Sequence, residues 1–514
     1  MQYLPIGIQN FEKLRNKNLK YVDKTSVLYN LVKSGCYYFL SRPRRFGKSL
    51  FLSTLEAYFQ GKKELFKGLA IEQLEKDWTE YPILYLDLNT RNYENKNSLL
   101  DELNKHMEKW EAFYGDAYQN RAIEERFEQI IQLVYKKTGK QVVILVDEYD
   151  KPMLQAIGNT ELQDTYRNTL KSFYGALKSC DQYIRFAFLT GVTKFSKVSI
   201  FSDLNNLDDI SMDAKYHDIC GITEQELYQH FGPYIETIAK KHSLTTEETY
   251  ARLKENYNGY HFCKETLPGI YNPFSLLNVF NKNDFGSYWF ETGTPTYLVE
   301  LLKKCNYNLS HLDKEEVTID VLTGIDAVSE NPIPVLYQSG YLTIKGYEKE
   351  FGLYNLGFPN REVKEGFVKF LVPHYAPKNQ TTPFDIHKFV LALRQGLIED
   401  FMLRLQTFLS GCPYEIQIEQ ERHFQSMMFI LSSLCGFYTE VEKHTNKGRM
   451  DMTIKTDQYI YLFEFKFNKT AEEALQQILN QAYAEPYTMD NRKVVCIGVN
   501  YSSDARNIDK WIVQ

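Results

Sequence analysis

A glycine, a lysine and a serine stand together at positions 47–49, where chemistry on phosphate groups is possible. Residues 36–41 before them read as an aromatic strand, and an apolar helical pattern follows from Lys48 to about Phe59. In such a turn backbone N–H groups surround phosphate oxygens, and Gly47 allows their close approach. Lys48 reaches the outer phosphates and Ser49 offers a hydroxyl to Mg²⁺. The spacing therefore predicts a phosphate-binding loop.

The loop departs from the general pattern G-x-x-x-x-G-K-[ST], because Arg42 stands where the first glycine is expected. Arg42, Arg44 and Arg45 form a charge cluster within it. Two interpretations stay open: these are solvated loop charges, or they contact phosphate or another domain, since guanidinium groups form bidentate bonds to phosphate oxygens. Arg45, Phe46 and Leu50 flank the tripeptide and belong to the predicted nucleotide site.

A second motif supports nucleotide binding. Residues 141–150, QVVILVDEYD, read as a strand buried on both faces that ends in acids. Asp147 is placed to hold Mg²⁺ through water and Glu148 to polarise the attacking water, with Asp150 as an accessory. Thr190, at the end of the next strand, can sense the γ-phosphate. Together with the loop, these positions favour a nucleotide site over a chance turn.

The elements that must position these residues alternate along the chain. Apolar strands at 81–89, 141–150 and 183–191 are separated by helical patterns at 97–114 and 161–179. Because strands that alternate with helices build parallel sheets, we expect a three-layer α/β domain over residues 1–210.

The rest of the chain divides into two further predicted regions. Residues 211–385 read mostly as helices broken by Gly/Pro turns, and we expect a lid or connector there. Hairpin-like segments at 335–345 and 351–357 could form a small winged element. Residues 386–514 begin as helices and then change at about 436 into short strands and a closing α/β segment.

A second set of chemically active residues lies near the C-terminus. Asp451 is in one alternating strand, and Glu464 and Lys466 share one face of the next. Adjacent strands lie about 4.8 Å apart, so the two carboxylates can hold one cation, Mg²⁺ or Mn²⁺. Such an ion activates water for phosphodiester cleavage, and Lys466 could orient the water or stabilise charge. The alternative is an amphipathic hairpin with ordinary polar residues facing outward.

Neighbouring segments supply weaker candidates for the same site. Gln477 lies in the helix predicted at 471–484, and Tyr483 of the same segment is a weaker candidate. Glu421, at the start of an upstream helix, could add a carboxylate, although charge at a helix N-terminus is the simpler explanation.

Seven segments in combination resemble the AAA-ATPase-like family of bacterial proteins. They are YVDKT (21–25), RPRRFGKSLFLSTL (42–55), VDEYDKP (146–152), LTGVTKFS (189–196), NGYHF (258–262), YNPFS (271–275) and YWFETGTP (288–295). The resemblance implies an N-terminal P-loop domain of the ASCE/AAA type, commonly joined to a C-terminal PD-(D/E)XK restriction-endonuclease-like α/β domain. The D-x₁₂-E-F-K arrangement of residues 451–466 agrees with that domain.

The resemblance also assigns roles by position. The resemblance implies that Arg42 is the residue expected at its position in this family, because the family's own loop reads R-P-R-R-F-G-K-S. Lys48, Ser49, Asp147 and Glu148 take the nucleotide and Mg²⁺ roles. Thr193 competes with Thr190 as the γ-phosphate sensor.

Composition limits the other possibilities. Lys and Arg total 60 against 66 Asp and Glu, a net charge of −6, so a nucleic-acid surface has to be a local basic groove. The eight cysteines form no C-x-x-C pair, which argues against a zinc cluster or disulfide framework. We find no signal peptide and no apolar run long enough to span a membrane, so a cytoplasmic protein is expected.

The leading hypothesis is an ATP-binding and ATP-hydrolysing protein whose nucleotide state controls a metal-dependent nuclease, with DNA favoured over RNA as substrate. The alternative is a nucleotide-dependent switch or scaffold with a nuclease-like domain that binds without cutting. A small-molecule kinase is disfavoured by the Asp147-Glu148 pair. An arginine finger (Arg167 or Arg185) and the oligomeric state stay open.

Overall fold

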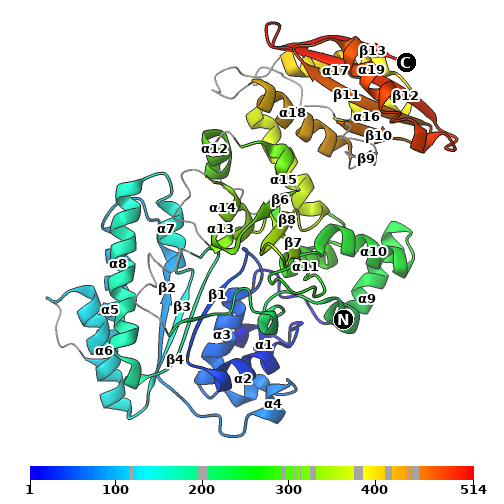
Figure 1. Cartoon of the computed structure of the whole chain (residues 1–514). Helices are drawn as coiled ribbons and strands as arrows, with labels where there is room; N and C mark the ends of the chain where they lie inside the picture. Colours follow the sequence, from blue (N-terminus) through cyan, green and yellow to red (C-terminus); the bar gives the residue numbers. More distant parts are fainter. Residues whose placement is uncertain are drawn as a thin grey trace. The chain divides into compact units, whose positions relative to one another are not determined.

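The computed structural model divides the chain into two compact units (Figure 1). It describes residues 1–115, 120–194, 206–290, 296–305, 307–312, 314–323, 331–375, 386–410, 420–436, 439–442 and 451–514. Unit 1 comprises Met1–Thr292 and Lys314–Val363, and unit 2 comprises Gly293–Asp313 and Lys364–Gln514. The domain boundaries at 210 and 385 divide the chain in another way and stay predictions.

Unit 1 is built on a five-stranded sheet in which every neighbouring pair is parallel. Its order is β2 (Ile83–Asp87), β3 (Val142–Asp147), β4 (Ile184–Gly191), β1 (Tyr37–Ser41) and β5 (Asp208–Asp209). The predicted parallel α/β sheet is confirmed. Because the strands are parallel, the residues after β1, β3 and β4 meet at one edge of the sheet.

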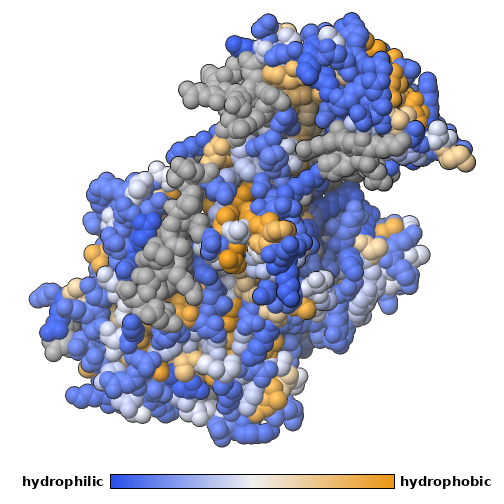
Figure 2. All heavy atoms as spheres, viewed as in Figure 1, coloured by the Kyte–Doolittle hydropathy of each residue, from blue (hydrophilic) through white to orange (hydrophobic). Residues whose placement is uncertain are grey.

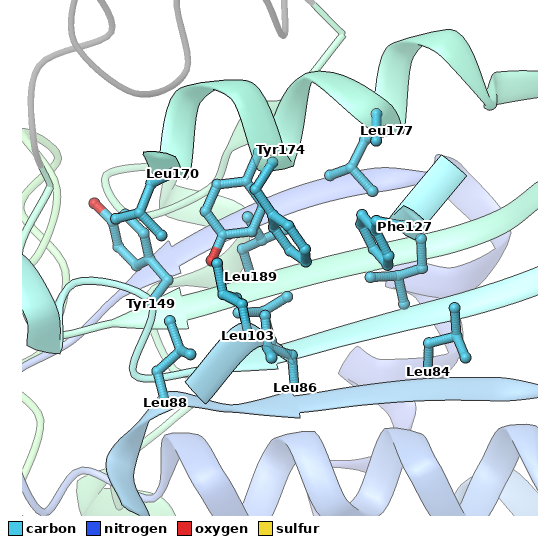
Figure 3. Close-up of a cluster of buried hydrophobic side chains, with 14 of the residues drawn as sticks. Leu84, Leu86, Leu88, Leu103, Phe127, Tyr149, Leu170, Tyr174, Leu177 and Leu189 are labelled. Atoms are coloured by element: carbon cyan, nitrogen blue, oxygen red, sulfur yellow. The ribbon is translucent and has the colours of Figure 1, made fainter. Parts of the chain in front are cut away.

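Helices cover both faces of this sheet, as expected for a three-layer domain. On one face lie α5 (Ser98–Tyr114), α6 (Ile123–Thr138) and α8 (Thr160–Ser179). Figure 3 shows their apolar side chains meeting those of β2 and β4, with Phe127 and Leu170 above Leu84, Leu86 and Leu189. On the other face α3 (Lys48–Phe59) packs through Phe51 against Phe188 of β4.

Short helices complete the first part of unit 1. They are α1 (Phe11–Asn16), α2 (Thr25–Ser34), α4 (Ile71–Leu74) and α7 (Lys151–Gln155). Arg15 of α1 donates hydrogen bonds to the carbonyl oxygens of Leu65 and Lys67, and Thr25 of α2 accepts one from the backbone N–H of Ile71. These bonds tie the N-terminal segment to the residues that follow α3.

The middle of the chain also belongs largely to unit 1. It contains α9 (Glu224–His242), α10 (Thr246–Tyr257), α11 (Pro273–Lys282), α13 (Ile319–Thr323) and α14 (Ile333–Gln338). A small antiparallel sheet has the order β6 (Glu315–Val317), β8 (Leu353–Gly357), β7 (Thr343–Glu348). The hairpin expected at 335–345 is wrong in its first half, because α14 occupies that stretch, with Pro334 in its first turn.

Unit 2 contains a mixed five-stranded sheet with helices on both faces. Its order is β13 (Asn507–Val513), β12 (Lys493–Ser502), β11 (Tyr459–Phe467), β10 (Met452–Lys455) and β9 (Glu440–Glu442), with only β11 and β12 parallel. The helices are α12 (Thr296–Lys304), α15 (Arg361–Tyr375), α16 (Ile386–Arg394), α17 (Ile398–Ser410), α18 (Gln420–Cys435) and α19 (Ala471–Asn480). Of these, α15 begins in unit 1 and continues into unit 2.

The central strand β11 is buried on both faces over most of its length. Leu462 packs with Ile478 of α19 on one face, and Phe463 contacts Phe401 of α17 on the other. The amphipathic pattern read from the sequence is therefore misleading, because the aromatic face and its opposite face are both covered.

The visible surface of both units is mainly hydrophilic (Figure 2). No helix among the described residues is long and apolar enough to cross a membrane.

Candidate functional site

The predicted phosphate loop forms a turn that leads directly into α3. Gly47 has φ of 96° and Arg45 φ of 69°, both in the left-handed region. A Cβ at Gly47 would have no neighbour within 4 Å, so the backbone torsion and not a lack of space favours glycine there. Few residues other than glycine adopt a positive φ, as Arg45 does. Such strained backbone conformations are concentrated at ligand-binding turns.

Lys48 is folded back onto its own loop. Its buried Nζ donates to the carbonyl oxygens of Arg42 (3.0 Å) and Pro43 (3.3 Å), and it lies 4.0 Å from Glu148 Oε1. The amine thus has acceptors supplied by the protein. To bind Lys48, a phosphate group would have to replace these carbonyl oxygens as the hydrogen-bond acceptors of the amine.

Acidic side chains gather opposite the loop at the end of β3. Asp147 is buried beside Ser49, whose side chain forms a hydrogen bond with it, and Glu148 follows with φ of 53°. Burial, reinforced by the charge of Glu148, raises the pKa of Asp147 to about 6. Asp87, at the end of β2, is in register with Asp147. Asp87 was not predicted as a site residue. The sequence does contain a signal for it, because an acid near the end of the strand predicted at 81–89 resembles Asp147 at the end of its own strand.

The two candidate sensors are already hydrogen-bonded within the protein. Thr190 Oγ1 donates to the carbonyl oxygen of Leu40 (3.0 Å), and Thr193 Oγ1 donates to Asp150 Oδ2 (2.6 Å). The buried Asp150 carboxylate also accepts from the backbone N–H groups of residues 192 and 193, and burial raises its pKa to about 6. A Cβ at Gly191 would lie 2.3 Å from Asp150 Oδ1, so only glycine permits this approach. A γ-phosphate-sensing role for either threonine stays a prediction.

In unit 2 the structure brings Asp451, Glu464 and Lys466 together. Asp451 directly precedes β10, one residue outside the strand in which it was expected, and its Oδ2 accepts from the backbone N–H of Phe465 (2.8 Å). Since Met452 pairs with Phe463, Asp451 and Glu464 lie at neighbouring positions of the two strands. Lys466 Nζ donates to Glu464 Oε1 at 3.0 Å.

Glu464 is the least ordinary group of this cluster. Its side chain is buried, and its Oε2 has no hydrogen-bond partner. Burial, followed by the charge of Asp451, raises the pKa of Glu464, while Lys466 and the backbone N–H of Asp451 oppose the shift. A buried carboxylate oxygen without a partner is costly unless something binds it. The alternative of an outward-facing polar hairpin is therefore wrong for Glu464.

The weaker candidates divide into one that joins the cluster and one that does not. Gln477 of α19 accepts a hydrogen bond from Lys466 Nζ (2.5 Å), so Lys466 bridges it to Glu464. Tyr483 is buried in the apolar core with Ile478 and takes no part. The side chain of Glu421 lies outside the described residues.

The residues of unit 2 fit a divalent cation of the Mg²⁺ type. In the part of the chain that the structure describes, no three His, Cys, Asp or Glu side chains converge as a ligand set. Mg²⁺ requires only one or two carboxylates and keeps waters in its other positions. Asp451 and the open oxygen of Glu464 supply that donor set. In unit 1, Ser49 and Asp147 supply the hydroxyl and carboxylate expected beside a nucleotide.

Comparison with known proteins identifies the family. A family model described as "Predicted AAA-ATPase" matches residues 5–201, and the PD-(D/E)XK nuclease superfamily model matches residues 419–511. An uncharacterized protein from the vnfD 5′ region of Azotobacter chroococcum mcd 1 is 36% identical over 527 residues, which cover 99% of this chain and 98% of that protein. The chain belongs to the AAA-ATPase-like family.

A structural neighbour adds little to this assignment. The Aeropyrum pernix ORC2 protein, solved as ADPNP–ADP complexes, matches 65% of this chain and 87% of its own at 10% identity, with a TM-score of 0.18. So low a score gives no support for equating their sites.

In this AAA-ATPase-like protein Arg42 is a structural clamp. It is buried and donates to the carbonyl oxygens of Ser211 and Tyr216, with its guanidinium 4.1 Å from the Phe262 ring. It is therefore not a solvated loop charge. It contacts the region after residue 210, as the second interpretation allowed, but through carbonyl groups and an aromatic ring.

The family's other aromatic motifs also reach the loop. Phe46 is buried edge-on against Tyr260 (4.8 Å between ring centroids) and Phe262 (5.4 Å) of the NGYHF segment. Only the Phe46 backbone can therefore line a phosphate pocket. Arg45 is exposed and lies 4.9 Å from the ring of Phe274 in the YNPFS segment. Two of the segments that carry the resemblance thus pack against the phosphate loop.

An apolar cavity of about 100 Å³ adjoins this loop at Gly47 and Leu50. Its walls come from the N-terminal segment, α3, the turn before α9, and the helices α9 and α11. They include Pro5, Tyr21, Val22, Phe51, Ile219, Ile222, Phe231 and Leu277. Unit 1 thus places an apolar cavity beside the start of α3.

Proposed function

We propose that this protein binds and hydrolyses ATP with Mg²⁺, and that its nucleotide state controls metal-dependent cleavage of nucleic acid, DNA before RNA, in the cytoplasm. The observation that carries the nuclease part is the buried, unpartnered Oε2 of Glu464 beside Asp451 and Lys466. A buried carboxylate oxygen without a partner, beside a second carboxylate and a lysine, is the arrangement that a cation site requires.

At the nucleotide site the proposed steps use residues already close together. Lys48 exchanges the carbonyl oxygens of residues 42 and 43 for phosphate oxygens, and backbone N–H groups at the start of α3 hold the same phosphates. Ser49 and Asp147 would hold Mg²⁺, which neutralises phosphate charge when bound. Glu148 then orients and polarises the attacking water. The apolar cavity beside Gly47 and Leu50 suits the flat nucleobase.

At the second site Asp451 and Glu464 would hold the cation, which when bound supplies an activated water and neutralises the phosphodiester charge. Lys466 donates to Glu464 and lies on the same face, so it can orient the water or stabilise developing charge. Gln477 fixes the position of the Lys466 amine. Gln477 is thus a positioning residue in this proposal.

A switch or scaffold that does not cut is the second candidate function. It is favoured by the internal hydrogen bonds of Lys48, Thr190 and Thr193, which give these three side chains partners within the protein. In that case nucleotide exchange alone would alter the binding properties of unit 2.

The deciding experiment is a cleavage panel. Wild type, Lys48→Ala and Glu464→Ala are incubated with DNA and with RNA, in Mg²⁺ or Mn²⁺, with and without ATP. Glu473→Gln, an exposed acid on α19, is the matched control for Glu464. The proposal expects cleavage by wild type and by the control and none by Glu464→Ala, with Lys48→Ala losing the response to ATP. ATP binding without any cleavage by wild type would leave the switch as the function.

A further inference from the structure

Glu362 is a buried acid that belongs to neither candidate site. Its side chain accepts a hydrogen bond from Ser275 Oγ (2.7 Å) through Oε2 and another from the backbone N–H of Trp289 (2.8 Å) through Oε1. The single carboxylate therefore joins the first turn of α11 to the segment around Trp289.

Both of these segments touch the phosphate loop at adjacent residues. The indole Nε1 of Trp289 donates to the carbonyl oxygen of Arg44 (3.0 Å), and Phe274, next to Ser275, lies under the guanidinium of Arg45. Arg45 is the non-glycine residue of the loop that has a positive φ. A backbone torsion of this kind persists only where surrounding contacts hold it, and these are the contacts on either side.

Glu362 also stands at the start of the helix that connects the two units. It is the second residue of α15, whose first turn is capped by Asn360 Oδ1, which accepts from the backbone N–H of Val363 (3.1 Å). Unit 1 ends at Val363, and α15 continues to Tyr375 in unit 2. The same carboxylate thus binds the loop's neighbours and fixes the beginning of the connecting helix.

We infer that Trp289 and Glu362 are positioning residues that hold the phosphate loop in its nucleotide-binding conformation and link the state of the loop to the start of α15. The inference rests on nucleotide binding at the loop, as proposed above. Because coupling between two sites is reciprocal, a nucleotide that shifts the Arg44 carbonyl changes the free energy of the Trp289 contact, and loss of that contact weakens nucleotide binding.

The test uses the full-length protein and ATP as the probe. Trp289→Phe keeps an aromatic ring but removes the indole N–H, and we expect ATP affinity by calorimetry to fall about three- to ten-fold, the effect of one lost hydrogen bond. Trp511→Phe is the matched control, because its indole Nε1 also donates a hydrogen bond, to Glu399 of unit 2. The control should bind ATP like wild type.

Glu362 offers a test by conservative rescue. In Glu362→Gln the amide oxygen can accept from the Trp289 N–H and the amide nitrogen can donate to Ser275 Oγ, so affinity should stay close to that of wild type. Glu362→Ala removes both bonds and should bind ATP at least as weakly as Trp289→Phe. Equal losses in the glutamine and alanine variants would contradict the positioning role.

A spectroscopic readout separates positioning from a general loss of stability. If the loop moves against the indole, ATP should change the tryptophan emission of wild type and of Trp511→Phe, and this change should be absent in Trp289→Phe. Normal ATP binding and an unaltered emission change in Trp289→Phe would overturn the inference while leaving the proposed function intact. Failure of wild type to bind ATP at all would instead overturn the proposed function.

Discussion

The phosphate loop of unit 1 differs from the acidic hairpin of unit 2 (Asp451–Phe467, which contains β10 and β11) in whether its buried polar groups have hydrogen-bond partners. At the loop the Lys48 amine has two carbonyl acceptors, and the Asp150 carboxylate accepts from backbone and hydroxyl donors. At the hairpin one buried oxygen of Glu464 has no hydrogen-bond partner. Lys48 and Asp150 thus have partners within the protein, whereas one oxygen of Glu464 has none.

This difference has a direct energetic meaning. A ligand at the loop must break internal hydrogen bonds before it forms its own, so part of its binding free energy is spent on rearrangement. A cation at the hairpin instead relieves an existing penalty. We therefore expect the Lys48 side chain to exchange its partners when nucleotide binds, whereas the carboxylates of the hairpin are already in place.

The largest expected effect concerns the hairpin. Lys466→Ala should lower nucleic-acid cleavage about a thousand-fold, because it removes the only described cation hydrogen-bonded to Glu464. ATP hydrolysis by the same variant should stay within about two-fold of wild type, since α19 and β11 lie in unit 2. Gln477→Ala, which only frees the amine, should cost about ten-fold. Equal losses of cleavage in both variants would show that Lys466 contributes only when Gln477 holds its amine in place.

The closed state of the loop is tested by Lys48→Ala. We expect ATP affinity, measured by calorimetry, to fall about a hundred-fold, because a charged donor to the phosphates is lost. Lys63→Ala, a change in the short helix after α3, serves as the control on another lysine. Unchanged ATP affinity in Lys48→Ala would mean that the lysine never leaves its carbonyl partners.

The pH dependence of stability probes Asp147, the buried acid at the end of β3. The folded pKa of Asp147 is about 6, above its usual value, so the folded state holds the proton more tightly than the unfolded chain. Stability therefore falls as the pH rises from about 4 to 6 and stays lowered above that range. In chelator-treated protein, Asp147→Asn should be more stable than wild type by about 2 kcal/mol at pH 7.5, and the gain should vanish towards pH 4. Urea unfolding at several pH values measures it, and a gain independent of pH would refute this explanation.

The smallest effect concerns the apolar cavity. Leu277→Trp places a larger side chain in the hollow beside Gly47, and ATP affinity should fall about ten-fold if the base binds there. Leu74→Trp, at an exposed leucine of α4 outside the cavity, is the matched control. Normal ATP binding by both variants would place the base elsewhere.

Much of unit 1 could be predicted because its signals are local. Lys48 and Phe59 are the bounds of α3, as expected. The strand that ends in acids is β3, and in the sheet β4 lies between it and β1, the strand before the phosphate loop. Continuous β-branched runs and a Gly-Lys-Ser turn suffice for such a sheet, since each depends on residues close in sequence.

The features that could not be predicted depend on distant residues. Arg42 reads as a loop charge until its partners Ser211 and Tyr216, about 170 positions away, are known. The alternation around Glu464 suggests one wet face, because a single strand cannot show that α17 and α19 will cover both sides. Likewise Thr190 is an apt sensor by position, yet its hydroxyl faces the Leu40 carbonyl of the neighbouring strand.

The interleaved course of the chain has a consequence for how the protein is made and how it can evolve. Because Gly293–Asp313 belongs to unit 2 while Lys314–Val363 returns to unit 1, the ribosome releases part of the second unit before the first is finished. That early segment has to wait for residues after Lys364 to be synthesised. A single recombination point near Lys364 would carry over an incomplete unit 2, so exchange of unit 2 alone between relatives requires three coordinated crossovers.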